Sequence, residues 1–452
     1  MAGDRKVLVV GAGLAGLAAA YTLSRDGFEV QVLEATPRLG GRVVQQARDG
    51  FRIDLGANLF LETYATTRRL AEQLGIPLRR TPVPIHSGIY RQGRLHGLYG
   101  GNDLASLRKT ARTMLSLQLL SSRGLWQVFK FARLLHAQQD HLSFDDPAQL
   151  LKLDTDESAA ELFATKIGAE ALDWLFGPGL SGYTFADPQQ IGAAYAMATL
   201  WHNGLNGVAW PCLPNGGAGA FVEALARACG ADLRLSTPVR RIVLEHGVAQ
   251  GVITDAGLVK ADAVICATTA SVALSITPDL PPAVRDTLRR VTYSKCCRVF
   301  FAVNSSPLPR DWYAVGFPQQ TGTFLTGLSN PSLLAPETVP EGKTLIDALV
   351  IGAPAQQLFA LKDEQVRAQA LAEVIRYLPD MSRTPLFSCV QRWPEAMCLL
   401  PGGTMTALQR LRQDGYGGVK RLCLAGDYMA VPSVNGALRS GLDAAAETAA
   451  QF

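Results

Sequence analysis

Hydrophobic and polar positions at the start of the chain follow the order of a strand, a turn, a helix and a second strand. Residues 6–10, KVLVV, form a short apolar run, and residues 29–34, EVQVLE, alternate as a half-buried strand does. Between them, residues 17–27 are good helix formers that end at a glycine. Strands joined through a helix predict a parallel sheet, because the crossover returns the second strand in the direction of the first.

Two later stretches carry related patterns. Residues 232–267 contain short apolar runs with turns at His-Gly and Ala-Gly, which predicts a meander of strands. Residues 421–449 begin as a strand, pass through a Gly-Asp turn and continue as a helix with small residues on its packing face. Residues 80–210 are predicted to be largely helical, and residues 290–410 mix strands with a helix. Two insertions therefore separate the three patterned pieces.

A glycine-rich turn joins the first strand to the first helix. Gly11, Gly13 and Gly16 form a GxGxxG motif: the first glycine allows the tight turn, the second lets the backbone approach a pyrophosphate, and the third lets the helix pack on the strand. The helix N-terminus offers free N–H groups to phosphates. Glu34 ends the next strand, where its carboxylate can bind both ribose hydroxyls and repel a 2′-phosphate. This favours FAD or NAD over NADP; the alternative is a glycine-rich loop that binds nothing.

Two motifs after the second strand favour FAD over NAD. RLGGRV places Arg42 behind two glycines, where a fixed cation suits a pyrophosphate that already lies on a helix end. FRIDLGAN places Gly56 where the backbone could pass close to a ring. The alternative for the second motif is an ordinary turn after a strand.

The uncharged run at residues 7–24 has the length of a signal peptide or a marginal membrane helix. A strand, a turn and a helix explain its glycines and the acid at position 34, whereas a signal peptide explains only its hydrophobicity. We therefore expect a cytoplasmic protein, with association to a membrane left open.

The composition is that of a globular protein with an ample core, because 48% of the residues are hydrophobic and 18% are charged. A formal net charge of +4 gives no reason to expect a nucleic-acid partner. None of the eight cysteines forms a CxxC pair and no zinc spacing occurs, so we expect no metal and reduced, mostly buried thiols. Cys296 and Cys297 are neighbours in a predicted strand and should point to opposite faces.

Three segments together resemble the flavin-containing amine oxidase superfamily, which includes protoporphyrinogen oxidase and the carotenoid desaturases. They are residues 11–43, DLGAN at 54–58, and LAGDYMAVPSVNGALRSGLDAA at 424–445. The resemblance implies an α/β fold in which a Rossmann-like, GR2-type FAD-binding domain is interleaved with a mixed α+β substrate-binding domain. The FAD-binding domain would comprise residues 1–80, 210–290 and 415–452, and the substrate domain residues 80–210 and 290–415.

The resemblance also assigns roles to individual residues. The three glycines of the motif would cradle the FAD pyrophosphate, Val239 would meet the adenine, and Asp427 the ribityl and phosphate end. The helix start at 434–437 would lie under the pyrimidine edge of the flavin, where its dipole stabilises negative charge. Cys398 is not where a covalent link would form, so non-covalent FAD is expected. The expected cofactor contacts are Gly11, Gly13, Ala15, Gly16, Glu34, Ala35, Gly41, Arg42, Gly56, Ala57, Asn58, Val239, Gly426, Asp427, Val434 and Ala437.

The chain departs from the amine oxidases of this superfamily at two places. They usually keep a lysine, linked through water to the flavin, in the strand that reads VTYSKCCRVFFAV here; Arg298 best fits that position, and Lys295 is three residues away. A solvated charge at the end of a strand is the alternative for both. The two aromatic rings that frame an amine are also incomplete, because Ser433 stands at one position and only Trp393 lies near the other. Both departures disfavour oxidation of a small amine.

Two further features are candidates for the substrate site. His202 and Trp210 flank a glycine-rich loop and could line a pocket, although a surface histidine and a core tryptophan are the simpler interpretation. Residues 104–139 contain no acid, and they interleave apolar residues with six basic ones. A basic amphipathic helix pair is compatible with an anionic membrane or an oily substrate channel, but two ordinary surface helices are favoured. The basic residues are Arg108, Lys109, Arg112, Arg123, Lys130 and Arg133.

The sequence favours an enzyme that takes hydride from a hydrophobic cyclic or polyene substrate, by C–C desaturation or protoporphyrinogen-oxidase-like dehydrogenation. No second GxGxxG follows a strand, so the substrate would reduce flavin N5 directly, and O2 or another acceptor would take the electrons. One alternative is oxidation of a small or biosynthetic amine, with Arg298 or Lys295 replacing the usual lysine. Another is a flavin-bound structural protein without turnover. The oligomeric state is not predicted.

Overall fold

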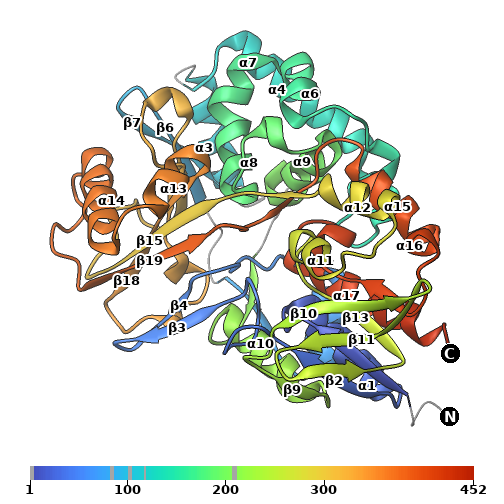
Figure 1. Ribbon diagram of the computed structural model, residues 1–452. Coiled ribbons are helices and arrows are strands. Elements are labelled where there is room, and N and C mark those ends of the chain that lie inside the picture. The colour runs from blue at the N-terminus through green and yellow to red at the C-terminus, as the bar shows by residue number, and fades with distance from the viewer. Residues whose placement is uncertain (1–4, 82–85, 100–103, 117–118, 206–210) are drawn as a thin grey trace.

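The computed structural model describes residues 5–81, 86–99, 104–116, 119–205 and 211–452. Within them, one large sheet lies at the left of Figure 1, a second lies at the lower right, and a group of helices lies at the top. No helix in these ranges is long and apolar enough to cross a membrane.

The sheet at the lower right of Figure 1 has five parallel strands, in the order β21-β13-β1-β2-β9. Both faces of a parallel sheet are covered, which favours apolar residues in its central strands, and residues 7–9 in β1 are fully buried. The α/β class and the opening strand–helix–strand unit are as predicted. The strands are β1 (Lys6–Val10), β2 (Glu29–Leu33), β9 (Asp232–Arg234), β13 (Ala263–Cys266) and β21 (Leu422–Leu424).

Helices α1 (Leu14–Arg25) and α17 (Val434–Ala449) pack against each other beside this sheet, although they lie at opposite ends of the chain. Their contact is built from glycine and alanine. A Cβ at Gly441 would overlap with the backbone carbonyl of Ala15. The small residues on one face of 434–449 therefore permit contact between the two backbones.

A separate antiparallel sheet contains β10 (Val239–Glu245), β11 (Val248–Thr254) and β12 (Gly257–Lys260). The meander predicted within 232–267 is confirmed for these three strands. The first and last strands of that stretch, β9 and β13, pair instead in the parallel sheet.

The sheet at the left of Figure 1 has seven strands in the order β19-β15-β18-β17-β16-β6-β7. Residues 80–210 were expected to be largely helical, yet the hairpin of β6 and β7 lies in this stretch and joins the sheet through parallel pairing of β6 with β16. The hairpin turns at Gln92 and Gly93, which both have positive φ. The strands are β6 (His86–Arg91), β7 (Arg94–Tyr99), β15 (Cys296–Val303), β16 (Trp312–Gly316), β17 (Gly327–Ser329), β18 (Thr344–Ile351) and β19 (Phe387–Trp393).

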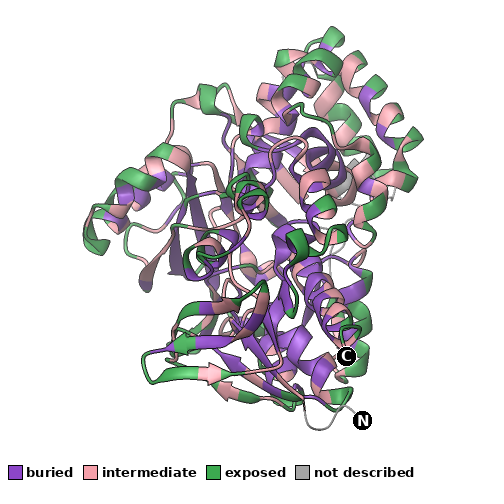
Figure 2. Ribbon diagram, turned by 45° about the vertical axis from the view of Figure 1, so that its right-hand side comes forward, coloured by how far each residue is buried: buried purple, intermediate pink, exposed green. Residues whose placement is uncertain are grey.

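All eight residues of β15 are buried, and they alternate between two sides of the sheet. Cys297 packs in the cluster that includes helix α14 (Asp363–Tyr377), whereas Cys296 packs in a different cluster on the other side. The prediction that the two cysteines point to opposite faces is confirmed. Figure 2 shows the two sheets as the main buried parts of the molecule.

Helices between residues 65 and 205 cover the upper part of the molecule (Figure 1). A π-helical turn, η3, interrupts them directly before α8. The helices in this part of the chain include α2 (Ala65–Gln73), α3 (Leu104–Leu115), α4 (Ser122–Ala137), α6 (Ala159–Lys166), α7 (Gly168–Ala171), η3 (Leu172–Phe176), α8 (Gly177–Thr184) and α9 (Ala193–Leu200). The division of the chain into two domains stays a prediction.

Replacing Gly441 by leucine is expected to lower the melting temperature by several degrees, because the new side chain would push α17 away from α1. Overpacking of this kind costs about 1–3 kcal/mol. Ala446→Leu is the control, since it places the same side chain at an exposed position of the same helix. A thermal melt followed by circular dichroism compares the two, and equal melting temperatures would contradict a tight α1–α17 contact.

Candidate active site

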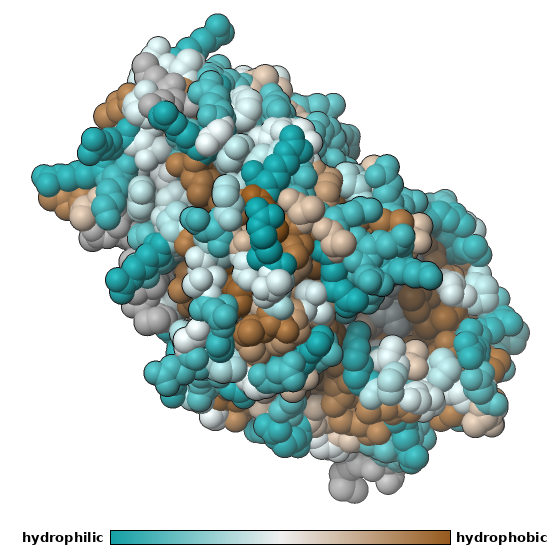
Figure 3. All heavy atoms as spheres, turned by 90° about the vertical axis from the view of Figure 1, so that its left-hand side faces the viewer, coloured by the Kyte–Doolittle hydropathy of each residue, from teal (hydrophilic) through white to brown (hydrophobic). Residues whose placement is uncertain are grey.

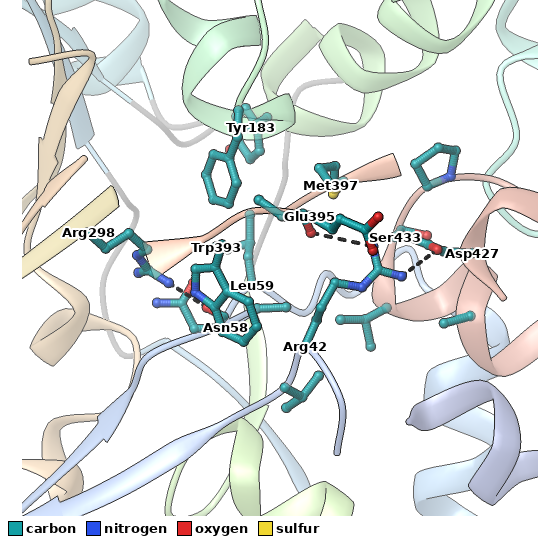
Figure 4. Close-up of a pocket in the computed structure, with 18 of the residues that line it drawn as sticks. Arg42, Asn58, Leu59, Tyr183, Arg298, Trp393, Glu395, Met397, Asp427 and Ser433 are labelled. Atoms are coloured by element: carbon teal, nitrogen blue, oxygen red, sulfur yellow. Dashed lines mark hydrogen bonds and ion pairs between the residues drawn. The ribbon is translucent and has the colours of Figure 1, made fainter. Parts of the chain in front are cut away.

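A cavity of about 1120 Å³ lies between the parallel sheet and the seven-stranded sheet. It exceeds the roughly 300–1,000 Å³ of an ordinary ligand pocket, so it has room for more than one small molecule. Loops at the carboxyl ends of β1, β2, β13 and β21 form one side. Strands β6, β15, β16, β17 and β18 and helix α8 form the other. Figure 4 shows the region where the two sides meet.

The glycine-rich turn forms part of the first side. Gly11 has a φ of +104°, and a Cβ there would lie 2.8 Å from the carbonyl oxygen of Ala267. A Cβ at Gly16 would overlap with the carbonyl of Gly11, so the helix can approach the strand only with glycine at this position. Gly13 faces open space in the cavity, with only Gly41 near it.

No side chain caps the N-terminus of α1, and Gly13, Leu14 and Ala15 line the cavity. The first N–H groups of an α-helix have no partner within the helix, and they carry the positive end of its dipole. Arg38 and Arg42 line the same side. The uncapped helix end and the two cations suit a group with two negative charges, such as a pyrophosphate.

Glu34 follows β2 and is held by three hydrogen bonds. Its carboxylate accepts from the N–H of Ala12 at 2.9 Å and from the N–H and hydroxyl of Thr36 at 2.9 and 2.8 Å. A carboxylate has about four acceptor sites, so further donors can still bind. Ala35 and Val239 line the cavity beside it. This corner therefore presents a fixed acceptor next to small apolar residues.

An ion pair joins the loop after β2 to the loop after β21. Nη2 of Arg42 lies 2.6 Å from Oδ1 of Asp427, whose side chain is almost fully buried. Burial lowers the pKa of Arg42, but the attraction of Asp427 outweighs it, so the pKa is raised and the guanidinium stays charged. Both residues and Gly426 line the cavity, and Figure 4 shows the pair beside Ser433.

Helix α17 also begins at the cavity, which Val434 and Ala437 line. The hydroxyl of Ser433 caps the helix by accepting from the N–H of Gly436 at 2.9 Å. Buried Asn435 fixes the helix start, because it donates to Asp145 at 2.8 Å. The ring expected at position 433 is thus replaced by a capping serine.

The segment from Gly56 to Asn58 runs between the two sides of the cavity. Gly56 is required by close backbone packing, since a Cβ there would overlap with the carbonyl of Arg42, and the N–H of Ala57 donates to that carbonyl at 2.9 Å. The sequence had suggested a ring as the neighbour of Gly56. The Nδ2 of Asn58 is buried and has no hydrogen-bond partner in the described part of the chain, and Asn58 lines the cavity, so it can donate to a bound molecule.

Arg298 lines the cavity from β15, but its guanidinium is already engaged. Nη2 lies 2.7 Å from Oδ2 of Asp347, and Nη1 donates to the carbonyls of Leu55 and Gly56 at 3.1 and 2.5 Å. Both partners of the pair are about 95% buried. Burial lowers the pKa of Arg298, and Asp347 outweighs this and raises it. Arg298 therefore holds the backbone before Ala57 and has little capacity to act on a substrate.

The other two catalytic candidates lie away from the cavity lining. Lys295 is exposed at the start of β15, and its Nζ is 3.3 Å from Oε1 of Gln356. Lys295 directly precedes the first residue of β15, Cys296, and it does not line the cavity. The Nε2 of His202 is 2.6 Å from the carbonyl of Leu142, and burial lowers the pKa of the imidazole, so it is neutral. Trp210 lies outside the described residues.

Several lining residues escaped the sequence analysis. Thr268 and Thr269 follow β13, and a signal existed for them, because ligands bind at the carboxyl ends of strands where the order of a parallel sheet reverses. Tyr183 and Tyr313 had no local signal. Trp393 was identified, and its Nε1 donates to the carbonyl of Leu55 at 3.0 Å, close to Arg298 (Figure 4).

Arg298→Met is expected to destabilise the protein by about 3–5 kcal/mol, because Asp347 would remain buried without its cation. The double variant Arg298→Met/Asp347→Leu removes both charges and should recover much of the loss. Thermal melting of the three proteins measures this. If the single variant melted like the wild type, the ion pair would not stabilise this part of the cavity lining.

Comparison with known proteins covers nearly the whole chain. The profile of a family described as flavin containing amine oxidoreductase matches residues 14–449. Coproporphyrinogen III oxidase of Bacillus subtilis (strain 168) is 24% identical over 456 residues, which span 92% of this chain and 93% of that protein. The zeta-carotene-forming phytoene desaturase of Myxococcus xanthus is 30% identical over 296 residues, or 58% of this chain and 53% of that protein. Wild-type putrescine oxidase bound to putrescine shares the fold, with a TM-score of 0.78, 20% identity and 99% of both chains covered.

The extent of the profile match decides the family, and the family implies the cofactor, non-covalently bound FAD. All eight cysteines lie in the described part of the chain and none of them lines the cavity. The chain belongs to the flavin containing amine oxidoreductase family and is an FAD-dependent oxidoreductase.

Proposed function

We propose that FAD binds along the side of the cavity formed by the parallel sheet. The uncapped N-terminus of α1 and Arg42 would hold the pyrophosphate, and Glu34 the adenosine ribose. Gly56 to Asn58 and the start of α17 would lie at the flavin end, with Val239 at the adenine end. The fit of a dianion to this helix end and its two cations supports the assignment. When bound, FAD supplies the hydride acceptor and passes the electron pair to O2 or another acceptor.

Glu34→Ala and Arg42→Ala are each expected to weaken FAD binding about 10- to 100-fold, because each removes hydrogen bonds to or from a charged group. Glu29→Ala and Arg227→Ala are matched controls at exposed positions. The ratio of visible flavin absorption to protein absorption after dialysis measures occupancy. Full occupancy in both site variants would reject this placement of FAD.

For the substrate, we propose an uncharged hydrophobic molecule that loses hydride from carbon, with C–C desaturation as the favoured reaction. A C–H bond breaks, its electron pair leaves with the hydrogen to FAD, the neighbouring carbon releases a proton to solvent, and a C=C bond forms. The side of the cavity away from the glycine-rich turn supports this, because its lining is mainly apolar. The larger apolar side chains are Ile89, Leu98, Leu175, Val315, Leu328 and Leu349.

The single observation that carries the proposal is that the charged groups on this side already have partners. Arg298 pairs with Asp347, and Arg392 lies 2.5 Å from Oδ1 of Asp363. Glu395 accepts hydrogen bonds from two hydroxyl groups at the border with the parallel sheet. A carboxylate in the described part of this lining would therefore be buried without a counter-ion, which costs several kcal/mol. An ammonium could pair there only with Glu395, whose carboxylate two hydroxyl groups already bind.

Uncharged hydroxyl and amide side chains supply the remaining polarity, and four of them are tyrosines: Tyr64, Tyr183, Tyr195 and Tyr313. Burial raises the pKa of Tyr313 to about 12 and that of Tyr64 further above its usual value, so both hydroxyls stay neutral at physiological pH. The cavity can thus donate or accept single hydrogen bonds without carrying charge. This suits a neutral polyene or ring better than a carboxylate-bearing porphyrinogen or a cationic amine.

Anaerobic bleaching of the flavin absorption band is expected with a neutral polyene precursor. With porphyrinogens and with primary or secondary amines, bleaching should be slower by at least about 100-fold, because the free-energy cost of an unpaired buried group lowers the rate by about this factor. Bleaching by amines alone would overturn the proposal in favour of amine oxidation. Bleaching by porphyrinogens alone would overturn the preference for an uncharged substrate. Retained FAD that none of these compounds reduces would indicate a structural role of the flavin.

The same assay on Gly182→Phe tests the position of the substrate. Gly182 lines the cavity from α8, and a Cβ there meets no atom within 4 Å, so a phenyl ring would occupy empty space. Substrate reduction of the flavin should fall while FAD occupancy stays unchanged. Ala164→Phe on α6 is the control, because it is exposed and does not line the cavity. Equal rates in both variants would place the substrate elsewhere.

A further inference from the structure

Helix α4 exposes two aromatic rings on its outer face. The side chains of Trp126 and Phe129 are 59% and 51% exposed, and their rings stack with centroids 5.6 Å apart and planes 20° apart. The opposite face of the helix packs inward through Gly124, Phe131 and Leu135, which are buried. The two exposed rings are therefore not needed for the core.

Three cations lie on the same outer face. Arg123, Lys130 and Arg133 are exposed, and with Trp126 they follow the three- and four-residue spacing that places side chains along one face of a helix. Residues 104–139 contain no acid that could neutralise them. We call Arg123, Trp126, Phe129, Lys130 and Arg133 the α4 face.

The preceding helix, α3, carries a similar combination. Leu104 and Leu115 are 62% and 73% exposed, and Arg108, Lys109 and Arg112 are exposed beside them. Ten large hydrophobic side chains are exposed in the described part of the chain, and four of them belong to α3 and α4. The other six belong to several elements, and two of them, Ile253 and Leu258, are partners across β11 and β12. Figure 3 shows hydrophobic residues among hydrophilic ones on one side of the molecule.

We propose that the α4 face docks on an anionic lipid bilayer. The cations would be attracted to anionic headgroups, and the indole and phenyl rings would insert at the level where headgroups meet acyl chains. An amphipathic helix of this kind lies in the plane of the interface, with basic residues flanking the rings. The positive charge and the two exposed rings of the α4 face match an anionic bilayer. A helix that faced only water would gain no free energy from exposing Trp126 and Phe129.

The position of α4 relative to the cavity suits a hydrophobic substrate. Phe131, on the inner face of α4, contacts the ring of Phe176 with centroids 5.7 Å apart. Phe176 belongs to η3, and its neighbour Leu175 lines the cavity. The α4 face is thus separated from the cavity by one layer of helix. Lipid binding is measured without turnover, so this proposal can fail or hold independently of the proposed reaction.

The test is co-sedimentation of the full-length holoprotein with vesicles. We expect binding to vesicles of phosphatidylcholine with phosphatidylglycerol, little binding to phosphatidylcholine alone, and weaker binding as salt concentration rises. Arg123→Gln/Arg133→Gln should lower the partition coefficient on the order of 25-fold, about fivefold for each cation. Trp126→Ser/Phe129→Ser should lower it about tenfold or more.

Two matched controls use exposed positions away from α4. Leu258→Ser/Leu386→Ser removes side chains of 53% and 51% exposure. Lys260→Gln/Arg383→Gln removes two exposed cations that have no side-chain partner among the described residues. Both should bind vesicles as the wild type does. Visible flavin absorption per protein confirms that each variant is folded. The emission of Trp126 is obtained by subtracting the fluorescence spectrum of Trp126→Phe from that of the wild type. This emission should shift to shorter wavelength when anionic vesicles are added.

Three results would overturn the proposal. The first is the absence of binding to anionic vesicles at low salt. The second is equal binding by the α4-face variants and their controls. The third is a dimer in sedimentation velocity that Trp126→Ser/Phe129→Ser dissociates, because the face would then contact a second copy of the chain.

Discussion

Helices α1 and α17 both begin at the cavity, and they can converge there only because their backbones are in contact. The contact between α1 and α17 depends on Gly441 and Ala15, and the contact between α1 and β1 depends on Gly16 and Gly11. Larger side chains at these points would move the helix ends by the width of a side chain. The N-terminal dipoles would then no longer converge on one site, because their effect is confined to the first turn. Close backbone packing, more than any charged residue, therefore sets the electrostatics of the cavity.

Ion pairs join segments that line the cavity and lie far apart in the sequence. One pair links Arg42, in the first patterned segment of the sequence, to Asp427, in the last. The other links Arg298 to Asp347 on the neighbouring strand of the seven-stranded sheet. Arg298 also donates to the backbone carbonyls of Leu55 and Gly56. Such pairs contribute little net stability compared with apolar residues, since desolvation offsets their attraction. They do penalise any arrangement that separates the partners. Their role here is to fix the position of the loops that line the cavity.

The parts of the site that could be predicted from sequence are those set by local spacing. The glycine turn, Glu34 and the helix after Asp427 follow from distances of a few residues within one strand–turn–helix unit. The hairpin of β6 and β7 could not be placed, because its partner β16 lies more than 200 residues later. Lys295 and Arg298 lie three residues apart in the sequence, but only the packed structure tells which of them meets the cavity. His202 could not be placed for a similar reason, since Thr199 and Asn203, four residues apart, line the cavity and His202 does not.

The distribution of charge constrains how such an enzyme can recognise its substrate. Inside the cavity, the cations on the substrate side, Arg298 and Arg392, already pair with Asp347 and Asp363, so they offer little attraction to an incoming anion. Affinity must then come from burial of apolar surface, which is proportional to area and has no direction. Selectivity follows from shape: glycines such as Gly179 and Gly182 leave space on α8 that a substrate of the right outline would fill. A hydrophobic pocket of this kind discriminates poorly between molecules that differ by one methylene, by about 1–3 kcal/mol, but rejects a charged one strongly.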